Sequence, residues 1–274
     1  MAVINTNISA IRASNASISA NKALATSMER LSTGKRINSS KDDAAGLAIA
    51  TSMTSLIKGM NQGIRNANDG ISLAQTADGA LSEVTNMLQR VRELAVQSSS
   101  GTYQDTDRAA MQSEVSALTQ QIDDVLSQTT FNGNTLFSTT SGTDVTFDIQ
   151  TGANSGETVT LTSSAIDGTN IDASALDVSS LAAAQTTLDN VDAALDEVNA
   201  TRATLGAGQN RLESAITNLT SNVTNLSDAR SRIQDADYSE ETTAMAKSQI
   251  LSQASTAMLA QANQAQQNVL SLLK

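Results

Sequence analysis

Residues 188–233 read LDNVDAALDEVNATRATLGAGQNRLESAITNLTSNVTNLSDARSRI. Alternating steps of three and four residues from Leu188 meet apolar side chains everywhere except at Arg202, Gln209 and Arg230. A 3.5-residue repeat held over so many heptads predicts one helix packed lengthwise against other helices. At 1.5 Å per residue it would be roughly 70 Å long. Such a helix needs partners of matching length, so this stretch decides the fold.

Two further apolar repeats predict those partners. From about Ala44 to Ser98, one heptad register gives way to another by a three-residue slip. The glycines of this stretch leave open whether it is one helix or two; they are Gly59, Gly63, Gly70 and Gly79. A turn rich in Ser, Gly and Thr then precedes a third helix, and helices joined by such a turn pack antiparallel. Its predicted seam is Met111, Val115, Leu118, Ile122 and Val125.

The middle of the chain changes character. Residues 145–149 and 159–161 alternate apolar and polar side chains around a turn-forming segment, which predicts a β-hairpin. We expect Phe131, Phe137 and Phe147 to form a small aromatic cluster that holds this hairpin to the bundle. Residues 163–180 are predicted to be polar and irregular.

Both ends of the chain are predicted helices with little apolar surface. Too weakly amphipathic to fold alone, they should become ordered only against partners. The predicted seam of the first helix includes Ile4, Ile8, Ile11 and Ile18, and that of the last includes Leu251, Met258, Val269 and Leu272.

Composition excludes several functions. The chain contains no His, Cys, Pro or Trp, so a His-based triad, a thiolate nucleophile and an ordinary zinc site are excluded. No phosphate or calcium loop has the required spacing. We therefore expect no enzyme activity, no cofactor and no metal. With a net charge of −11 and no Lys or Arg between Arg108 and Arg202, the chain is not suited to nucleic acid.

Membrane insertion and signal-dependent secretion are not expected either. No apolar run approaches the roughly 18 residues of a membrane span. Residues 1–40 lack the continuous apolar block of a cleavable secretory signal. If exported, the protein should leave by another route.

One charged cluster, Leu88–Gln97, has two interpretations. Arg90, Glu93, Leu94 and Gln97 follow helical spacing and form one mixed stripe. It could be a salt-bridged surface. It could also be an interface, since Arg and exposed Leu are typical anchors.

Several motifs resemble those of bacterial flagellins. They are LSTGKRIN (31–38), DDAAGLAI (42–49), NDGIS (68–72), QRVRELAVQ (89–97), LGAGQNRL (205–212), SRIQDAD (231–237), LAQANQ (259–264) and QNVLSLL (267–273). They cover both terminal thirds in family order, although Gln266 stands where many relatives carry Pro. The short middle suggests that the large outer domains of longer flagellins are absent.

The resemblance implies a structural subunit that polymerises into an extracellular flagellar filament for swimming. It implies type III export, an export chaperone, and contacts with hook-junction and cap proteins. It also implies recognition of the monomer by an animal Toll-like receptor through the Leu88–Gln97 stripe, which we predict is also a subunit contact in the filament. The matching positions are Gln89, Arg90, Leu94 and Glu114, with Glu93 and Gln97 alongside. A hook–filament junction protein and, from another class, an intracellular coiled-coil adaptor are the alternatives.

Taken together, we expect a mainly α fold: an elongated antiparallel helical bundle with a small β-hairpin region. The resemblance implies that residues 1–40 and 236–274 pair as a coiled coil in the inner tube of the filament. Residues 41–137 and 179–235 would form the bundle. Residues 138–178 would be a hairpin and irregular outer segment attached to it.

Overall fold

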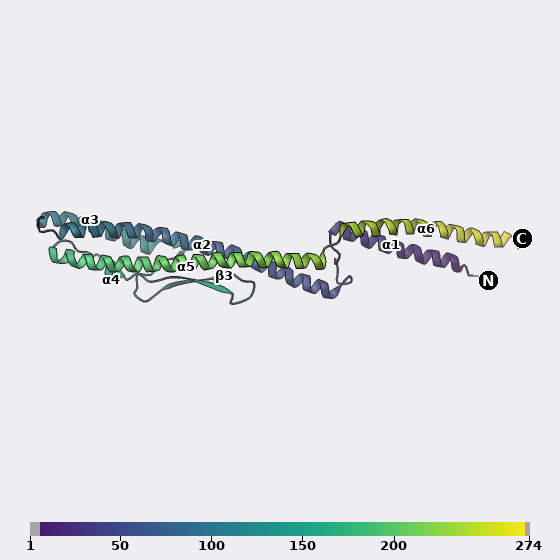
Figure 1. Ribbon diagram of the computed structural model, residues 1–274, viewed down its shortest axis with the longest axis horizontal. Helices are drawn as coiled ribbons and strands as arrows, with labels where there is room; N and C mark the ends of the chain where they lie inside the picture. Colours follow the sequence, from purple (N-terminus) through teal and green to yellow (C-terminus); the bar gives the residue numbers. More distant parts are fainter. Residues whose placement is uncertain (1–5, 272–274) are drawn as a thin grey trace. The chain divides into compact units, whose positions relative to one another are not determined.

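The computed structural model describes residues 6–271, with side chains described as far as Gln266. The chain divides into two units (Figure 1). A terminal unit combines Met1–Ser55 with Thr224–Lys274, and a bundle unit comprises Leu56–Val223. These boundaries fall within the two longest helices. The hairpin and the irregular segment belong to the bundle unit.

The bundle unit is built from three long helices that run side by side (Figure 1). They belong to α2 (Ala44–Ser98), α3 (Asp105–Gln128) and α5 (Leu181–Gln234). The predicted helices are therefore confirmed, and α2 is one helix despite its glycines. The predominantly helical fold with a small β region is confirmed as well.

The buried face of α5 differs from the predicted seam at every second position. Val191, Val198, Leu205 and Leu212 are buried as predicted, but Leu195, Arg202 and Gln209 are only half-buried. The residues one position earlier are buried instead: Ala194, Thr201 and Gly208. Their small side chains allow close helix approach, whereas Arg202 reaches outward to Asp78 of α2 at 2.8 Å.

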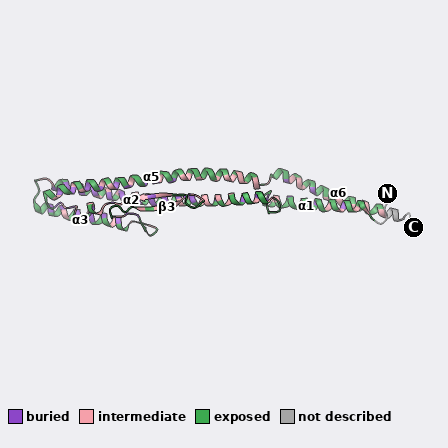
Figure 2. Cartoon of the chain, turned by 90° about the horizontal axis from the view of Figure 1, so that it is seen from below, coloured by how far each residue is buried: buried purple, intermediate pink, exposed green. Residues whose placement is uncertain are grey.

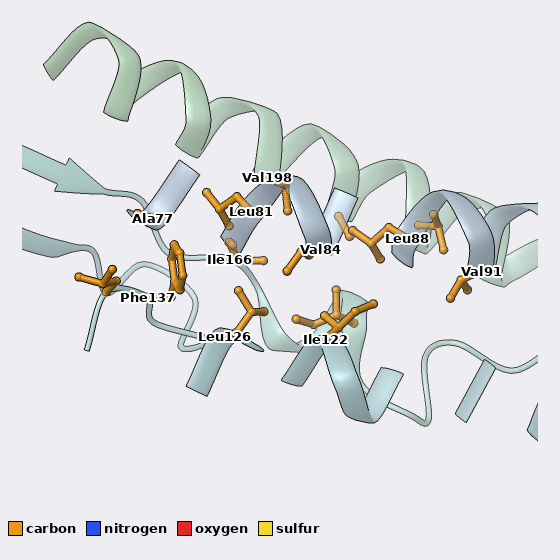
Figure 3. Close-up of a cluster of buried hydrophobic side chains, with 14 of the residues drawn as sticks. Ala77, Leu81, Val84, Leu88, Val91, Ile122, Leu126, Phe137, Ile166 and Val198 are labelled. Carbon is orange, nitrogen blue, oxygen red and sulfur yellow. The ribbon is translucent and has the colours of Figure 1, made fainter. Parts of the chain in front are cut away.

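The core lies where α2, α3 and α5 meet (Figure 3). The second register predicted for α2 is buried throughout: Ala77, Leu81, Val84, Leu88, Val91 and Ala95. On α3, Met111, Val115 and Ile122 are buried as predicted, but Thr119 and Leu126 take the places of Leu118 and Val125. Side chains of moderate size thus fill a narrow core, consistent with the scarcity of aromatic residues.

A buried arginine fastens the turn between α2 and α3. Arg108 is 5% exposed and donates hydrogen bonds to Ser98 Oγ at 3.2 Å and to the carbonyl oxygens of Ser100 and Tyr103. Because a helix C-terminus carries partial negative charge, a cation is favourable beside the end of α2. Sequence reasoning missed this role.

Two antiparallel hairpins follow α3. The first joins β1 (Thr130–Phe131) to β2 (Asn134–Thr135). Its turn residues Asn132 and Gly133 have φ values of 50° and 82°, as an Asn-Gly type I′ turn requires. The second pairs β3 (Val145–Gln150) with β4 (Thr158–Ser163), with Phe147 opposite Leu161. The predicted hairpin is confirmed.

The second hairpin approaches helices at glycine positions. A Cβ atom at Gly63 of α2 would collide with the backbone carbonyl of Thr151, and one at Gly59 would lie 2.8 Å from the Cβ atom of Ala153. On α5, a Cβ atom at Gly208 would collide with Leu161. These glycines, which weaken isolated helices, therefore provide space for the hairpin.

The segment after β4 contributes more side chains to the hydrophobic core than its polar composition predicted. It contains a short helix, α4 (Gly168–Ile171), and is otherwise irregular. Its large apolar side chains are nevertheless buried in the bundle core: Ile166, Ile171, Leu176 and Val178. The aromatic residues also differ in environment, since Phe137 is buried whereas Phe131 and Phe147 are half-buried.

In the terminal unit, α1 (Ile8–Thr33) pairs with α6 (Tyr238–Ser271), as expected. A joint of short extended segments holds the start of this pair. Lys35 and Asp235 form an antiparallel bridge, and the backbone N–H of Arg36 donates to the carbonyl of Gln234 at 2.7 Å. The Arg36 side chain also donates to the carbonyl of Ile233 at 2.6 Å.

Candidate functional site

The contact between α1 and α6 is made mainly by small side chains. Along α1, buried and half-buried residues recur at steps of three and four, and so do those along α6. The α1 set is Ala10, Ala13, Ser17, Ala20, Leu24, Ser27 and Leu31; the α6 set is Glu241, Met245, Ser248, Ser252, Ser255, Leu259 and Ala262. We call these residues the Ala/Ser seam. Their spacing is that of a coiled coil with closely approaching backbones.

The large apolar residues predicted for this seam lie outside it. Ile8, Ile11 and Ile18 are 51%, 52% and 53% exposed, while Leu251 and Met258 are 48% and 64% exposed. That part of the prediction is wrong, because the helices meet through the small residues of the same repeat. Ile4 and Leu272 lie outside the described residues, and the side chain of Val269 is not described.

These exposed side chains form an apolar outer surface on the terminal unit. At 100° per residue, Ile8, Ile11 and Ile18 project from the face of α1 opposite Ala13 and Ala20. We call the full set the outer apolar residues: Ile8, Ile11, Ile18, Met28, Ile250, Leu251 and Met258. Figure 2 shows how largely exposed both helices are. Large apolar side chains exposed repeatedly along two helices make these helices a candidate protein–protein interaction site.

Polar contacts fix the register of α1 against α6. Near the joint, Arg30 Nη1 lies 2.8 Å from Glu241 Oε1, and Glu241 is buried. Farther along, Ser252 Oγ donates to Asn21 Oδ1 at 2.8 Å. Near the N-terminal end, Asn7 Nδ2 donates to the carbonyl of Ala262 at 3.0 Å. Pairing is thus specified along the described length although the seam is weakly apolar.

Asp42 organises the connector that leads into α2. Its Oδ2 atom accepts hydrogen bonds from the backbone N–H groups of Ser39 and Asn38 and from the Ser39 hydroxyl. The Ser39 N–H, followed by the Asn38 N–H, holds the pKa of Asp42 below its ordinary value. Next in the chain, Asp43 Oδ1 accepts from the N–H of Gly46 at 2.9 Å and caps α2.

The predicted charged stripe lies in the bundle unit and joins α2 to α3. Arg90 Nε lies 2.9 Å from Glu114 Oε1, and Arg90 Nη1 lies 2.9 Å from Glu93 Oε2. The hydrogen bonds with Glu114 and then Glu93 raise the pKa of Arg90. Gln89 and Gln97 are exposed on the same helix. An exposed ion-pair network is therefore present, as the surface interpretation requires.

Leu94 does not belong to the exposed part of this stripe. It is only 2% exposed and lies in the core with Val91 and Ala95. The expectation of an exposed Leu94 is wrong, because α2 contacts α3 on one side and α5 on the other, which widens its buried face. The exposed apolar side chain nearby is Val96, which is 50% exposed.

A second exposed ion pair marks the side of α2 that meets α5. Arg92 Nε donates to Asp192 Oδ1 at 2.8 Å, and Nη2 donates to Oδ2 at 3.3 Å. The hydrogen bond from Arg92 lowers the pKa of Asp192. Exposed pairs of this kind contribute little to stability, because water and salt screen their charges. They orient the helices more than they hold them together.

Within residues 6–271, no group of three acidic side chains is placed to hold a metal ion. In the same part of the chain, no helix is both long and apolar enough to span a membrane. The candidate sites are therefore surfaces: the outer apolar residues of the terminal unit and the Arg90 stripe of the bundle unit.

Comparison with known proteins assigns this chain to a family. Residues 4–142 match the bacterial flagellin N-terminal helical region, and residues 188–273 match the bacterial flagellin C-terminal helical region. The flagellin of Xenorhabdus nematophila is 43% identical over 313 residues, covering 99% of both chains. The flagellin of Halalkalibacterium halodurans is 45% identical over 280 residues, covering 99% of this chain and all of its own.

A structural relative shares the fold alone. It is a protein assigned as a flagellar hook-associated protein of Vibrio parahaemolyticus, with a TM-score of 0.60 at 17% identity. The match covers 71% of this chain and 100% of the other. The full-length sequence matches decide the family: this chain belongs to the bacterial flagellins, the structural subunits of the flagellar filament.

Proposed function

We propose that this chain polymerises through its terminal unit into a filament that drives swimming. The observation that carries this proposal is the outward position of the large apolar residues on α1 and α6. A helix pair that served only itself would place Ile8, Ile11 and Ile18 between its helices. Here small residues fill that position, which leaves the larger ones available to neighbouring copies.

The energetics favour assembly of many copies over a stable isolated pair. Fully burying an Ile, Leu or Met side chain stabilises by about 1.5–3 kcal/mol, so covering the exposed half of one contributes about 1 kcal/mol. The Ala/Ser seam buries much less apolar area per residue. Neighbouring copies should therefore supply most of the free energy that orders the ends of the chain.

The family resemblance supports a location for the filament and a route for its export. We place the filament outside the cell, with export through the flagellar type III route and a chaperone on the C-terminal helix before assembly. Hook-junction and cap proteins would contact the first and last subunits. Residues 1–40 and 236–274 would form the inner tube, residues 41–137 and 179–235 the surrounding bundle, and residues 138–178 the outer part.

Seeded growth of purified protein tests the proposal. The wild type should extend seeds to micrometre filaments, whereas a junction protein would cap them without elongation. Changing Ile8, Ile11 and Ile18 together to Ala should raise the critical concentration at least tenfold, since about 1.4 kcal/mol is a factor of ten. Matched Ser9→Ala and Ser19→Ala changes on the same exposed helix should have little effect. Equal growth of both variants would contradict the proposal.

We further propose that the Arg90 stripe of the free subunit is recognised by a Toll-like receptor. Its exposed charges and amides support this: Gln89, Arg90, Glu93, Gln97 and Glu114. Leu94, which is buried in the core, would contribute by holding the exposed residues of the stripe in position. In the filament, the same stripe would face a neighbouring subunit.

A matched pair of double variants separates recognition from stability. Arg90→Ala with Glu114→Ala removes an exposed ion pair on the α3 side, and Arg92→Ala with Asp192→Ala removes one on the α5 side. Receptor-reporter activation should fall strongly for the first and little for the second, with similar melting temperatures. Equal receptor activation by the two variants would reject the assignment.

A further inference from the structure

The bundle unit contains a surface hollow whose lining residues have no role in the proposed function. It has a volume of about 590 Å³ and lies among α2, the β1–β2 turn and β3. The residues that give it character are Asp69, Leu73, Phe131, Asn132, Phe147 and Asp148. We call it the β3 hollow.

Its lining combines aromatic rings with negative charge. Phe131 and Phe147 are half-buried and pack against the core, so their rings are held in place. Asp69 and Asp148 are exposed, and no Lys or Arg is among the lining residues. A cation over an aromatic ring, with carboxylates nearby, gains both from the ring quadrupole and from charged hydrogen bonds.

The carboxylates of Asp69 and Asp148 differ in the hydrogen bonds that they already accept within the subunit. Asp148 Oδ1 accepts a hydrogen bond from Thr160 Oγ1 at 2.6 Å across the hairpin. In the described part of the chain, the Asp69 carboxylate makes no hydrogen bond or ion pair. Asp69 therefore keeps its full capacity to accept hydrogen bonds from an incoming group.

We propose that the β3 hollow receives a Lys or Arg side chain from a neighbouring copy in the filament. This inference rests on the proposed polymerisation, which covers the bundle with other subunits. Covering two carboxylates without a counter-charge is costly, because a buried charge needs a partner. The covering surface must then bring a cation, and exposed cations without an ion pair are present in the described chain, including Lys58 and Arg211.

The three phenylalanines make the hollow directly observable. In protein labelled with fluorinated Phe, two of the three signals come from the hollow, and buried Phe137 serves as an internal reference. N-acetyl-arginine amide added to the unassembled subunit should shift the Phe131 and Phe147 signals saturably. The uncharged N-acetyl-glutamine amide should not, and an Asp69→Asn/Asp148→Asn variant should lose the response. Absence of a saturable shift in the wild type would overturn the proposal.

Filament growth tests whether a neighbour supplies the cation. Asp69→Asn/Asp148→Asn should raise the critical concentration by about threefold to tenfold. Asp189→Asn/Asp196→Asn, with the same change in charge on the exposed face of α5, should not. Asp69→Asn alone, which breaks no contact within the subunit, should show a smaller effect in the same direction. If the wild type polymerises and the hollow variants match the control, this inference fails while the proposed function stands. If the wild type does not polymerise, the proposed function itself fails.

Discussion

The guanidinium of Arg30 lies 2.8 Å from the carboxylate of Glu241 and joins α1 to α6 beside the joint of the terminal unit. The Glu241 side chain is 10% exposed and that of Arg30 is 31% exposed. Removal of one partner leaves a largely desolvated charge, whereas exchange of both for apolar residues does not.

Replacing Glu241 with Ala should therefore loosen the helix pair. We expect a loss of about 1–2 kcal/mol, less than for a fully buried pair because Arg30 remains partly solvated. Hydrogen exchange in α1 and α6 of assembled protein would measure it. The double change Arg30→Met/Glu241→Met should restore much of the protection. If the single and double variants were equally unprotected, the charge pair would not be the cause.

Gly63 should tolerate no side chain. Gly63→Ala forces a methyl group onto the Thr151 carbonyl, and we expect a loss of about 1–3 kcal/mol despite the better helix propensity of Ala. Gly79 is exposed on the same helix with open space around it, so Gly79→Ala should stabilise by up to about 1 kcal/mol. Urea unfolding of both variants checks this prediction. The two substitutions should change the free energy of unfolding in opposite directions. A gain in stability from both would refute the close approach of the hairpin to Gly63.

Leu94 should behave as a core residue. Leu94→Ala should cost about 2–5 kcal/mol of unfolding free energy, whereas Val96→Ala two positions away should cost less than about 0.5 kcal/mol. Thermal unfolding of the bundle provides the measurement. If Leu94→Ala left the free energy of unfolding unchanged, Leu94 could not be a core residue. A Leu94→Asp variant would also damage the core and cannot probe an interface by itself.

Acid should weaken the connector at Asp42. The folded-state pKa of Asp42 lies below its unfolded value of about 3.9, because backbone N–H groups stabilise the carboxylate. Its contribution is therefore fully present above roughly pH 4 and is lost as pH falls through the folded pKa. Asp42→Asn should be less stable than the wild type at neutral pH, and this deficit should shrink in acid. A deficit independent of pH in denaturant titrations would exclude the charge as its origin.

The sequence predicted the elements well and their contact faces less well. The bounds of α2 and the existence of α5 follow from long heptad repeats, and the hairpin follows from strict alternation. The terminal seam was misplaced because α1 carries two possible faces, one with Ile8 and Ile18 and another with Ala13 and Ala20. Periodicity favours the larger side chains, but a single chain does not reveal which face meets its own partner and which meets another copy.

Residues that contact more than one other segment of the chain were harder still to predict. Leu94 is buried because α2 is contacted by two helices at once, and Arg108 is buried because three acceptors gather at the turn. The glycines of α2 left open whether this stretch is one helix or two, and their role became visible only with the hairpin beside Gly63. Each of these features depends on contacts between segments distant in sequence, which no local pattern encodes.

Other copies should cover the exposed apolar residues of α1 and α6 in the filament. Peroxide oxidation followed by mass spectrometry tests it directly, because Met28 and Met258 are 56% and 64% exposed and Met111, at 7%, is an internal reference. In unassembled subunits Met28 and Met258 should oxidise rapidly. In filaments both should be strongly protected, while Met111 stays slow in both states. Equal oxidation of Met28 and Met258 before and after assembly would contradict the account.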